Sequence, residues 1–309
     1  MRVRNVPKRA LPDDEASETE RLKSQFSPPR RSSSGLNRGN ASLLGLVRLP
    51  SVKESVVVTG SSSGIGLAVA TLLLSKGFAV TLHGLDKAEV QTAFQKLDDG
   101  TKRLAAHYGD LSDPDTADQL FSTAVSHFGT LNHIVCAAGL QTYGAATTPP
   151  EDDLRLALEV NVMGTFNPIR SSIESIRLNR GSITVVSSSQ ASRTQENVVG
   201  YTTSKSALNG MVRALAVDEA KFGVRVNAVL PGAIDTPMLR ESARLFGNGS
   251  VEDTLRGWGH AHPLGTVGDA SDVAHACAFL LSGEAKFITG TELFVDGGLT
   301  VRSAVHLTP

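Results

Sequence analysis

The chain has 309 residues, of which 30 are basic and 31 acidic, and 40% are hydrophobic. This length suits one large α/β domain or two small ones, and the balanced charge gives no indication of a nucleic-acid partner. No run of about 18 or more apolar residues occurs, so the sequence predicts no membrane span.

Residues 1–52 differ in composition from the rest of the chain. They contain clusters of Arg and Lys, an acidic patch at Asp13 to Glu15 and a Pro-Pro pair, and no hydrophobic period persists. We interpret this stretch as a disordered extension, followed by one ordered domain over residues 53–309. A mitochondrial transit peptide is the alternative, but acidic residues between Asp13 and Glu20 argue against it. We therefore expect a cytoplasmic protein.

The ordered part begins with a strand and a glycine-rich turn. Residues 55–59 form a short apolar run, which is typical of a buried parallel strand. The turn from Gly60 to Gly66 follows, and then a predicted helix over 67–76 that is closed by Gly77. Such a turn exposes backbone N–H groups at the positive end of a helix. The sequence therefore predicts a phosphate-binding turn.

Strands and helices continue to alternate, which predicts a doubly wound parallel sheet of the Rossmann type. Sites in such sheets form outside the carboxyl ends of the strands. Asp110, Gly139, Ser187 to Ser189 and Pro231-Gly232 all fall at such ends. The predicted strands cover residues 78–83, 104–107, 131–136, 182–187, 224–230 and 292–296, and the predicted helices cover 113–128, 151–178 with a bend near Pro168, and 201–218. The two cysteines, Cys136 and Cys277, lie in apolar segments, and we expect buried reduced thiols.

Tyr201 and Lys205 lie four residues apart on the last of these helices, and therefore on one face. A phenol has a pKa of about 10, and lowering it to about 7 requires about 4 kcal/mol. An ammonium group about 4 Å away in an intermediate dielectric supplies an energy of that order. The spacing can therefore make Tyr201 a general acid/base. Taken alone, this spacing occurs by chance in many helices, so the surrounding motifs decide whether Tyr201 and Lys205 are functional.

Those motifs together resemble the short-chain dehydrogenase/reductase family, over residues 54–298. Ala137 replaces the Asn that the family usually carries, and that Asn mainly steadies the sheet. The matching motifs are Thr59-Gly-x-x-x-Gly-Ile-Gly66, Asp110-Leu111, Ala137-Ala-Gly139, Asn161, Pro231-Gly-x-Ile-x-Thr236 and Asp296-Gly-Gly298. The resemblance implies a hydride transfer between a nicotinamide dinucleotide and a secondary alcohol or ketone. It implies a small-molecule substrate and requires no metal.

The resemblance also implies a catalytic tetrad of Asn161, Ser188, Tyr201 and Lys205. Ser188 is chosen among three consecutive serines because it lies thirteen residues before Tyr201, the usual spacing in the family. Tyr201 would exchange a proton with the substrate oxygen, and Ser188 would hydrogen-bond the same atom. Lys205 would lower the pKa of Tyr201 and bind the nicotinamide ribose. Asn161 would bend its helix and hold a water beside Lys205.

The cofactor residues follow from the same motifs, and we expect NAD in preference to NADP. Ser63 and the stretch from His83 to Asp86 offer no Arg for a 2′-phosphate, and Asp86 stands where an acid meets the ribose hydroxyls. Asp86 could equally open a helix at Lys87, so NADP stays an alternative. The expected contacts are Gly60, Ser62, Ser63, Gly64, Ile65, Gly66, Asp86, Asp110, Leu111, Ala138, Gly139, Tyr201, Lys205, Pro231, Gly232, Ile234 and Thr236.

The substrate is not specified by the sequence. Residues 236–263 are where family members carry a substrate lid, and Gln141, Tyr143, Gln190 and Trp258 are candidates to face the substrate. His83-Gly84-Leu85 and Ala138-Gly-Leu-Gln141 resemble the family's hydroxybutyrate dehydrogenases, which leaves a small hydroxy acid as an option. It is not favoured, because Gln190 stands where those enzymes carry a His and Val198 where they carry a carboxylate-binding Lys. The alternatives are an NADP-linked reductase of acyl-carrier or other ketone intermediates, and a dinucleotide-sensing protein without catalysis.

The resemblance also implies a homodimer or homotetramer. Family members usually pair through the helix that carries Tyr201 and the long helix before the catalytic strand. The far face of the Tyr201 helix offers small and apolar residues suited to close helix contact. These residues are Ala207, Met211, Ala214 and Leu215.

Overall fold

The computed structural model describes residues 54–147 and 151–303, which belong to one compact unit. The predicted disordered extension lies outside the described residues. In the described part of the chain, no helix is both long and apolar enough to cross a bilayer. Within the same residues, no three His, Cys, Asp or Glu side chains gather in a way that could hold a metal ion.

The centre of the fold is a seven-stranded parallel sheet with the order β3-β2-β1-β4-β5-β6-β9. The predicted doubly wound sheet is therefore confirmed. The order reverses between β1 and β4, and this switch point is where such sheets bind ligands. The strands are β1 (Ser55–Thr59), β2 (Ala79–Gly84), β3 (Leu104–Tyr108), β4 (His133–Cys136), β5 (Ser182–Val186), β6 (Arg225–Pro231) and β9 (Glu292–Val295).

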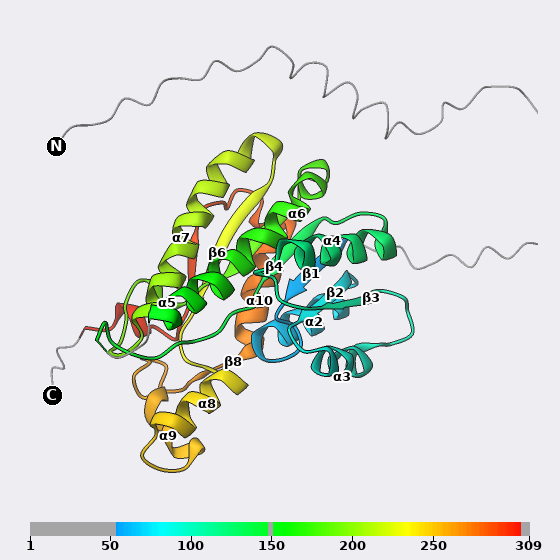
Figure 1. The fold of residues 1–309 in the computed structure, drawn as a ribbon. Coiled ribbons are helices and arrows are strands. Elements are labelled where there is room, and N and C mark those ends of the chain that lie inside the picture. Colours follow the sequence, from blue (N-terminus) through cyan, green and yellow to red (C-terminus); the bar gives the residue numbers. More distant parts are fainter. Residues whose placement is uncertain (1–53, 148–150, 304–309) are drawn as a thin grey trace, which may run out of the picture. The chain divides into compact units, whose positions relative to one another are not determined.

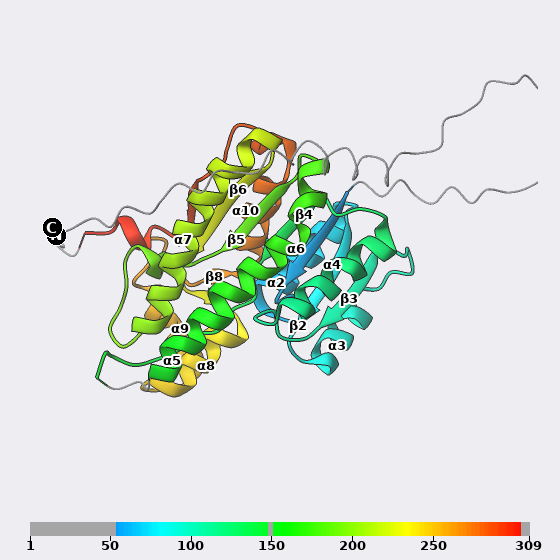
Figure 2. The same ribbon diagram turned by 45° about the horizontal axis from the view of Figure 1, so that its top comes forward.

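Helices cover both faces of this sheet, as the two views in Figure 1 and Figure 2 show. Alternate residues of a strand point to opposite faces, so Val56 and Val58 join one apolar core while Val57 joins the other. The first core includes residues of α2 (Gly64–Ser75), α3 (Lys87–Leu97) and α10 (Ala270–Leu281). The second includes residues of α4 (Pro114–Phe128), α6 (Gly164–Leu178) and α7 (Val199–Glu219). Helix α10 was not predicted from the sequence.

The two cysteines are free and buried, as expected, and they lie in different cores. Cys136 ends β4 and packs with the α4, α6 and α7 side of the sheet. Cys277 lies in α10 and packs on the opposite side. Burial raises the pKa of each thiol to about 12. Both side chains are therefore protonated apolar groups at neutral pH.

The long helix predicted over 151–178 is interrupted, but not at Pro168. The structure has α5 (Glu151–Leu158), a π-helical turn η1 (Glu159–Met163) and then α6, and Pro168 lies inside α6. The bend predicted near Pro168 itself stays a prediction. A π turn accommodates an extra residue and re-aims a side chain, and here the side chain at its centre is Asn161.

Residues 236–263, the predicted lid, contain two short helices that Figure 1 shows beyond the sheet. They are α8 (Pro237–Phe246) and α9 (Val251–Gly259). Thr236 and Ser250 cap them, because each hydroxyl accepts a backbone N–H from the first turn. A small parallel pair, β7 (Ile234–Asp235) and β8 (Gly268–Asp269), closes the base of this segment.

Candidate active site

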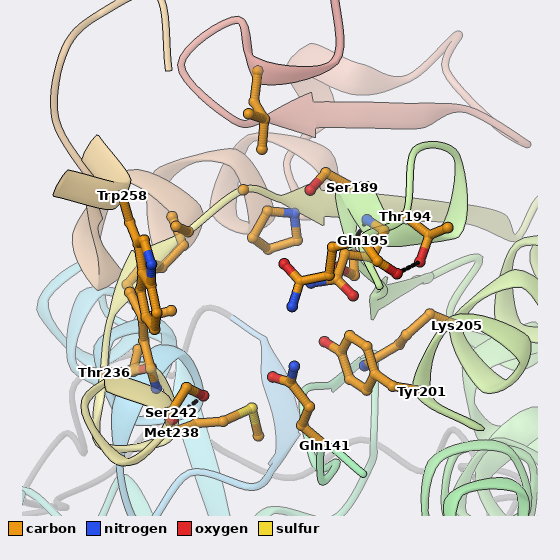
Figure 3. Close-up of a pocket in the computed structure, with 18 of the residues that line it drawn as sticks. Gln141, Ser189, Thr194, Gln195, Tyr201, Lys205, Thr236, Met238, Ser242 and Trp258 are labelled. Carbon is orange, nitrogen blue, oxygen red and sulfur yellow. Dashed lines mark hydrogen bonds between the residues drawn. The ribbon is translucent and has the colours of Figure 1, made fainter. Parts of the chain in front are cut away.

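A cavity of about 660 Å³ opens at the carboxyl ends of β4, β5 and β6 and extends under the lid segment. This volume is within the range of small-molecule sites. Ser188, Tyr201 and Lys205 line it together with Gly139 and Gly232. Figure 3 shows the Trp258 indole across the cavity from the Tyr201 phenol, with the amides of Gln141 and Gln195 directed into the space between them.

Tyr201 lies in the first turn of α7, with its side chain buried. Of the three consecutive serines, Ser188 hydrogen-bonds the Tyr201 phenol. Ser187 instead donates its hydroxyl to the Lys205 backbone carbonyl, and Ser189 begins a short 3₁₀ turn. The Ser188 hydroxyl also accepts the Gln190 N–H at 3.1 Å, so Ser188 both caps this turn and faces Tyr201.

Lys205 lies one turn further along α7 and is also buried. Its Nζ donates to the Val186 carbonyl oxygen at 3.0 Å and lies 5.6 Å from the centre of the Tyr201 ring. Gly139 provides the space beside it, because a Cβ at that position would lie 3.5 Å from Nζ and 3.0 Å from the Asn161 Oδ1. Lys205, Gly139 and Asn161 thus lie against one another.

Asn161 is buried in the π turn, and its amide holds the strand-end segment after β4. Its Oδ1 accepts the Leu140 N–H at 2.8 Å. Its Nδ2 donates to the Leu140 carbonyl and to the Ser204 hydroxyl, each at 2.9 Å. The side chain therefore joins η1, the segment after β4 and α7, which are the elements that position Gly139, Tyr201 and Lys205. The expected water beside Lys205 stays a prediction.

Burial dominates the protonation of Tyr201 and Lys205 in this cluster. Burial raises the pKa of Tyr201 to about 12, although the hydrogen bond from Ser188 opposes the rise. Burial also lowers the pKa of Lys205 to about 8. The Lys205 ammonium lies 5.6 Å from the centre of the Tyr201 ring, and its expected lowering of the Tyr201 pKa stays a prediction. At neutral pH Tyr201 is a proton donor beside a charged Lys205.

The glycine-rich turn after β1 fits a dinucleotide phosphate. Gly60 and Gly64 adopt left-handed backbone conformations, with φ of 64° and 53°. A Cβ on Gly66 would lie 2.2 Å from the Gly60 carbonyl oxygen, so only glycine fits where α2 meets the turn. The N-terminal N–H groups of α2 are thereby brought to the surface of the turn, where an anion can approach the backbone.

The other predicted cofactor residues also lie at strand ends. Ala138 follows β4, and its N–H donates to Thr59 Oγ1 at 3.1 Å. Asp110 follows β3, and its carboxylate accepts the Ser112 N–H, while Leu111 is buried in the core. Ile65, Pro231, Gly232, Ile234 and Thr236 line the cavity directly.

Asp86 takes the structural role that the sequence left open. Its side chain accepts the Glu89 N–H at 2.9 Å and caps α3. The Glu89 carboxylate contacts the glycine turn, because it accepts the Ser62 hydroxyl at 3.3 Å. Gly84, at the usual acidic position, packs so closely that a Cβ would lie 2.9 Å from the Ser62 hydroxyl. Glu89 was missed by sequence reasoning, although its spacing of three from a helix cap could have indicated it.

All of the predicted substrate residues line the cavity: Gln141, Tyr143, Gln190 and Trp258. Tyr143 hydrogen-bonds Ser242 of α8, and its ring lies 4.6 Å from that of Phe246. The segment between Ser189 and Tyr201 contributes a further polar wall that the sequence did not identify, because it lies between predicted elements. Its cavity-lining residues are Arg193, Thr194, Gln195, Glu196 and Asn197.

Comparisons with known proteins agree with this geometry. A family model described as enoyl-(acyl carrier protein) reductase matches residues 60–300. L-fucose dehydrogenase of Mus musculus is 37% identical over 249 residues, which cover 79% of this chain and 87% of that protein. The chain belongs to the short-chain dehydrogenase/reductase family.

Two further members of the short-chain dehydrogenase/reductase family are similar along most of their length. Glucose 1-dehydrogenase of Gluconobacter oxydans is 33% identical, over 80% of this chain and 92% of its own. The structure of Thermoplasma acidophilum aldohexose dehydrogenase has a TM-score of 0.76 and 33% identity, and covers 84% of this chain and 98% of its own. The chain is therefore an NAD(P)-dependent oxidoreductase that acts on a CH–OH group or the corresponding ketone.

Proposed function

We propose that this enzyme is an NAD-linked dehydrogenase of a small polyhydroxylated substrate, a sugar or a related polyol. The observation that carries the proposal is the polar wall of the cavity that faces Tyr201. Gln141, Gln190, Gln195 and Asn197 all line it. Each amide both donates and accepts hydrogen bonds, which suits a substrate with hydroxyl groups on several neighbouring carbons.

Gln190 supports this reading through its unsatisfied side chain. Its Oε1 is buried, and it has no hydrogen-bond partner among the residues that the structure describes. A buried carbonyl oxygen without a partner costs free energy, because it has lost its water without gaining a donor. A substrate hydroxyl that donates to this oxygen would recover that loss, whereas an apolar substrate would not.

Trp258 supplies the complementary surface. Its indole lies across the cavity from the Tyr201 phenol, as Figure 3 shows. A flat aromatic face packs against the C–H groups of a sugar ring, while the indole N–H remains free to meet a hydroxyl. The names of the three relatives given above also point to sugars as their substrates.

The proposed chemistry divides between the cofactor and these side chains. The dinucleotide supplies the hydride chemistry, and the glycine turn with the α2 N-terminus would hold its phosphates. Tyr201 would exchange a proton with the substrate oxygen, to which Ser188 would also hydrogen-bond. The positive charge of Lys205 favours the phenolate that is needed when an alcohol is oxidised. Asn161 would keep Gly139 and Lys205 in place.

The proposed preference for NAD rests on Glu89. The adenosine ribose of a bound dinucleotide lies at the end of the second strand in this fold class. Glu89 is hydrogen-bonded to Ser62 there, and its charge would repel the extra phosphate of NADP. Lys87 carries an opposing charge nearby, but its ammonium lies 5.2 Å over the Tyr108 ring. We therefore place the discriminating negative charge on Glu89 and not on Asp86.

We also infer that the enzyme assembles as a dimer or tetramer through α7. Ala207 and Ala214 are exposed on this helix, and Met211 and Leu215 are half-buried between them. Small exposed residues allow two helices to approach closely across a two-fold axis. Light scattering at micromolar concentration should give at least twice the monomer mass, and Ala214→Arg should reduce it. A monomeric wild-type protein would contradict the inference.

The proposed substrate class is tested by nicotinamide absorbance with a panel of L-fucose, D-glucose, polyols, hydroxy acids, hydroxysteroids and ketones. We expect kcat/KM for a sugar or polyol to exceed that for the other classes at least about a hundredfold, or about 2.7 kcal/mol. Gln195→Leu should raise KM for the sugar and leave the Kd for NAD unchanged. Faster turnover of a hydroxysteroid or of a β-ketoacyl thioester would overturn the proposal and favour the reductase alternative.

A further inference from the structure

His262 lies at the end of the lid segment, just beyond α9, and its side chain is 3% exposed. Both ring nitrogens contact backbone. Nε2 accepts the Ala233 N–H at 3.2 Å, and Nδ1 lies 3.2 Å from the Trp258 carbonyl oxygen. The ring therefore connects the loop after β6 with the lid helix that carries Trp258.

The partners of the ring settle where its proton lies. An N–H group donates to Nε2, so Nε2 carries no hydrogen. A neutral imidazole then carries its hydrogen on Nδ1, where it can donate to the Trp258 carbonyl. One ring thus makes one accepting and one donating bond, and no other neutral side chain of similar size presents this pair at the same two points.

Two glycines make room for this ring. A Cβ on Gly232 would lie 2.9 Å from the His262 Nε2, and one on Gly297 would lie 3.3 Å from the His262 Cβ. The backbone after β6 and the turn after β9 therefore pack directly on the side chain. Displacement of the ring would require one of these two backbone segments to move with it.

The two segments that His262 connects line the same cavity from different sides. Pro231, Gly232 and Ala233 form its wall beside the expected nicotinamide end of the cofactor, and Trp258 forms its wall on the lid. We propose that His262 is a positioning residue that couples the dinucleotide-facing loop to Trp258, so that cofactor binding sets the lid for the substrate. This coupling depends on the dinucleotide site of the family and holds whichever alcohol is oxidised.

Trp258 is the only tryptophan of the chain, so its fluorescence reports on this part of the cavity alone. The experiment uses the full-length protein and measures Trp258 emission and calorimetric binding during titration with NAD⁺. ADP-ribose is the matched ligand, because it fills the phosphate site and lacks the nicotinamide. We expect NAD⁺ to change the emission and the acrylamide quenching of Trp258, and ADP-ribose to change them much less. If NAD⁺ and ADP-ribose change the emission and quenching of Trp258 equally in the wild-type protein, the proposal is wrong, and no variant is needed to show it.

Two variants separate the two hydrogen bonds. His262→Asn places an amide near Nδ1 and keeps a donor toward Trp258, whereas His262→Gln places an acceptor near Nε2 and keeps the bond to Ala233. Each variant should bind NAD⁺ with a Kd within about threefold of wild type yet lose more than half of the emission change, because each breaks one end of the bridge. KM for the substrate should rise about tenfold, equivalent to about 1.4 kcal/mol, with a smaller change in kcat.

His260→Asn is the control, because His260 is exposed and two residues away. It should leave emission, KM and Kd as in the wild type. Melting temperatures identify any variant that has lost its fold. A folded His262→Asn or His262→Gln enzyme that keeps both the full emission change and the wild-type KM would show that Trp258 senses the nicotinamide directly, and the proposed coupling would then be wrong.

Discussion

The glycine turn and the substrate cavity differ in which atoms form their surfaces. Around Gly60 to Gly66 the surface is backbone, and its shape depends on the absence of side chains. In the cavity, the wall consists of side chains from segments far apart in the chain, among them Gln141, Gln195, Ser242 and Trp258. A backbone surface tolerates almost no substitution, whereas a side-chain surface can be changed one group at a time. The first suits a cofactor common to many relatives, and the second suits a particular substrate.

Removing the proton donor is expected to have the largest effect. Tyr201→Phe should lower kcat about a thousandfold, the order of a general acid/base contribution, because the phenol hydroxyl is lost while the ring remains. The Kd for NAD⁺ should change by less than about twofold, because only the proton donor is removed. Steady-state kinetics and calorimetry measure the two. A variant that keeps more than a few per cent of wild-type kcat would exclude Tyr201 as the acid/base.

Lys205 stands between the two sides, and its burial has an expected effect on stability. Its folded pKa of about 8 lies below its usual 10.5, so burial of the charged ammonium destabilises the folded state at neutral pH. Lys205→Met should inactivate the enzyme and yet raise the free energy of unfolding at pH 7 by about 3 kcal/mol.

The pH dependence gives the sign of this effect. Between about pH 8 and the usual pKa of 10.5, the unfolded chain binds more protons at Lys205 than the folded chain. The unfolding free energy of the wild type should therefore rise with pH in this window, relative to Lys205→Met. Denaturant titrations at pH 7 and near pH 10 compare the two proteins. A variant less stable than the wild type at pH 7 would mean that the Val186 contact outweighs the buried charge.

Gly66→Ala tests the backbone surface. Its Cβ would meet the Gly60 carbonyl oxygen at 2.2 Å, so the turn must shift. We expect the Kd for NAD⁺ to rise about a hundredfold, or about 2.7 kcal/mol, by calorimetry. Gly283→Ala is the matched control, since a Cβ there meets no atom within 4 Å. Unchanged NAD⁺ binding in a folded Gly66→Ala protein would show that the turn does not hold the phosphates.

Glu89→Gln should have the smallest effect and should alter selectivity alone. The ratio of Kd values for NADP⁺ and NAD⁺ should fall about tenfold, because a repulsive charge worth about 1.4 kcal/mol is removed. Asp86→Asn is the control, because Asn also caps helices and this change leaves Glu89 in place. If Asp86→Asn shifted the ratio and Glu89→Gln did not, Asp86 would be the residue that repels the 2′-phosphate, as the sequence predicted.

The same contrast explains what the sequence could predict. The sheet, the glycine turn and the positions of Tyr201 and Lys205 follow from local patterns of strand, turn and helix. The contacts of Asn161 do not, because its side chain reaches Leu140 and Ser204, which are distant in sequence. Pro168 lies inside α6 and does not mark the interruption of the helix. Glu89 and the wall from Arg193 to Asn197 also required the fold, because their roles depend on which segments face each other.

The two buried thiols have a practical consequence. A thiol reagent needs both access and a thiolate, and neither Cys136 nor Cys277 offers either in the native protein. Alkylation must therefore wait for the surrounding structure to open. Because one cysteine lies on each side of the sheet, mass-spectrometric labelling rates would time the opening of the two layers separately. The two native cysteines therefore report the unfolding of the two sides of the sheet, and no engineered probe is needed.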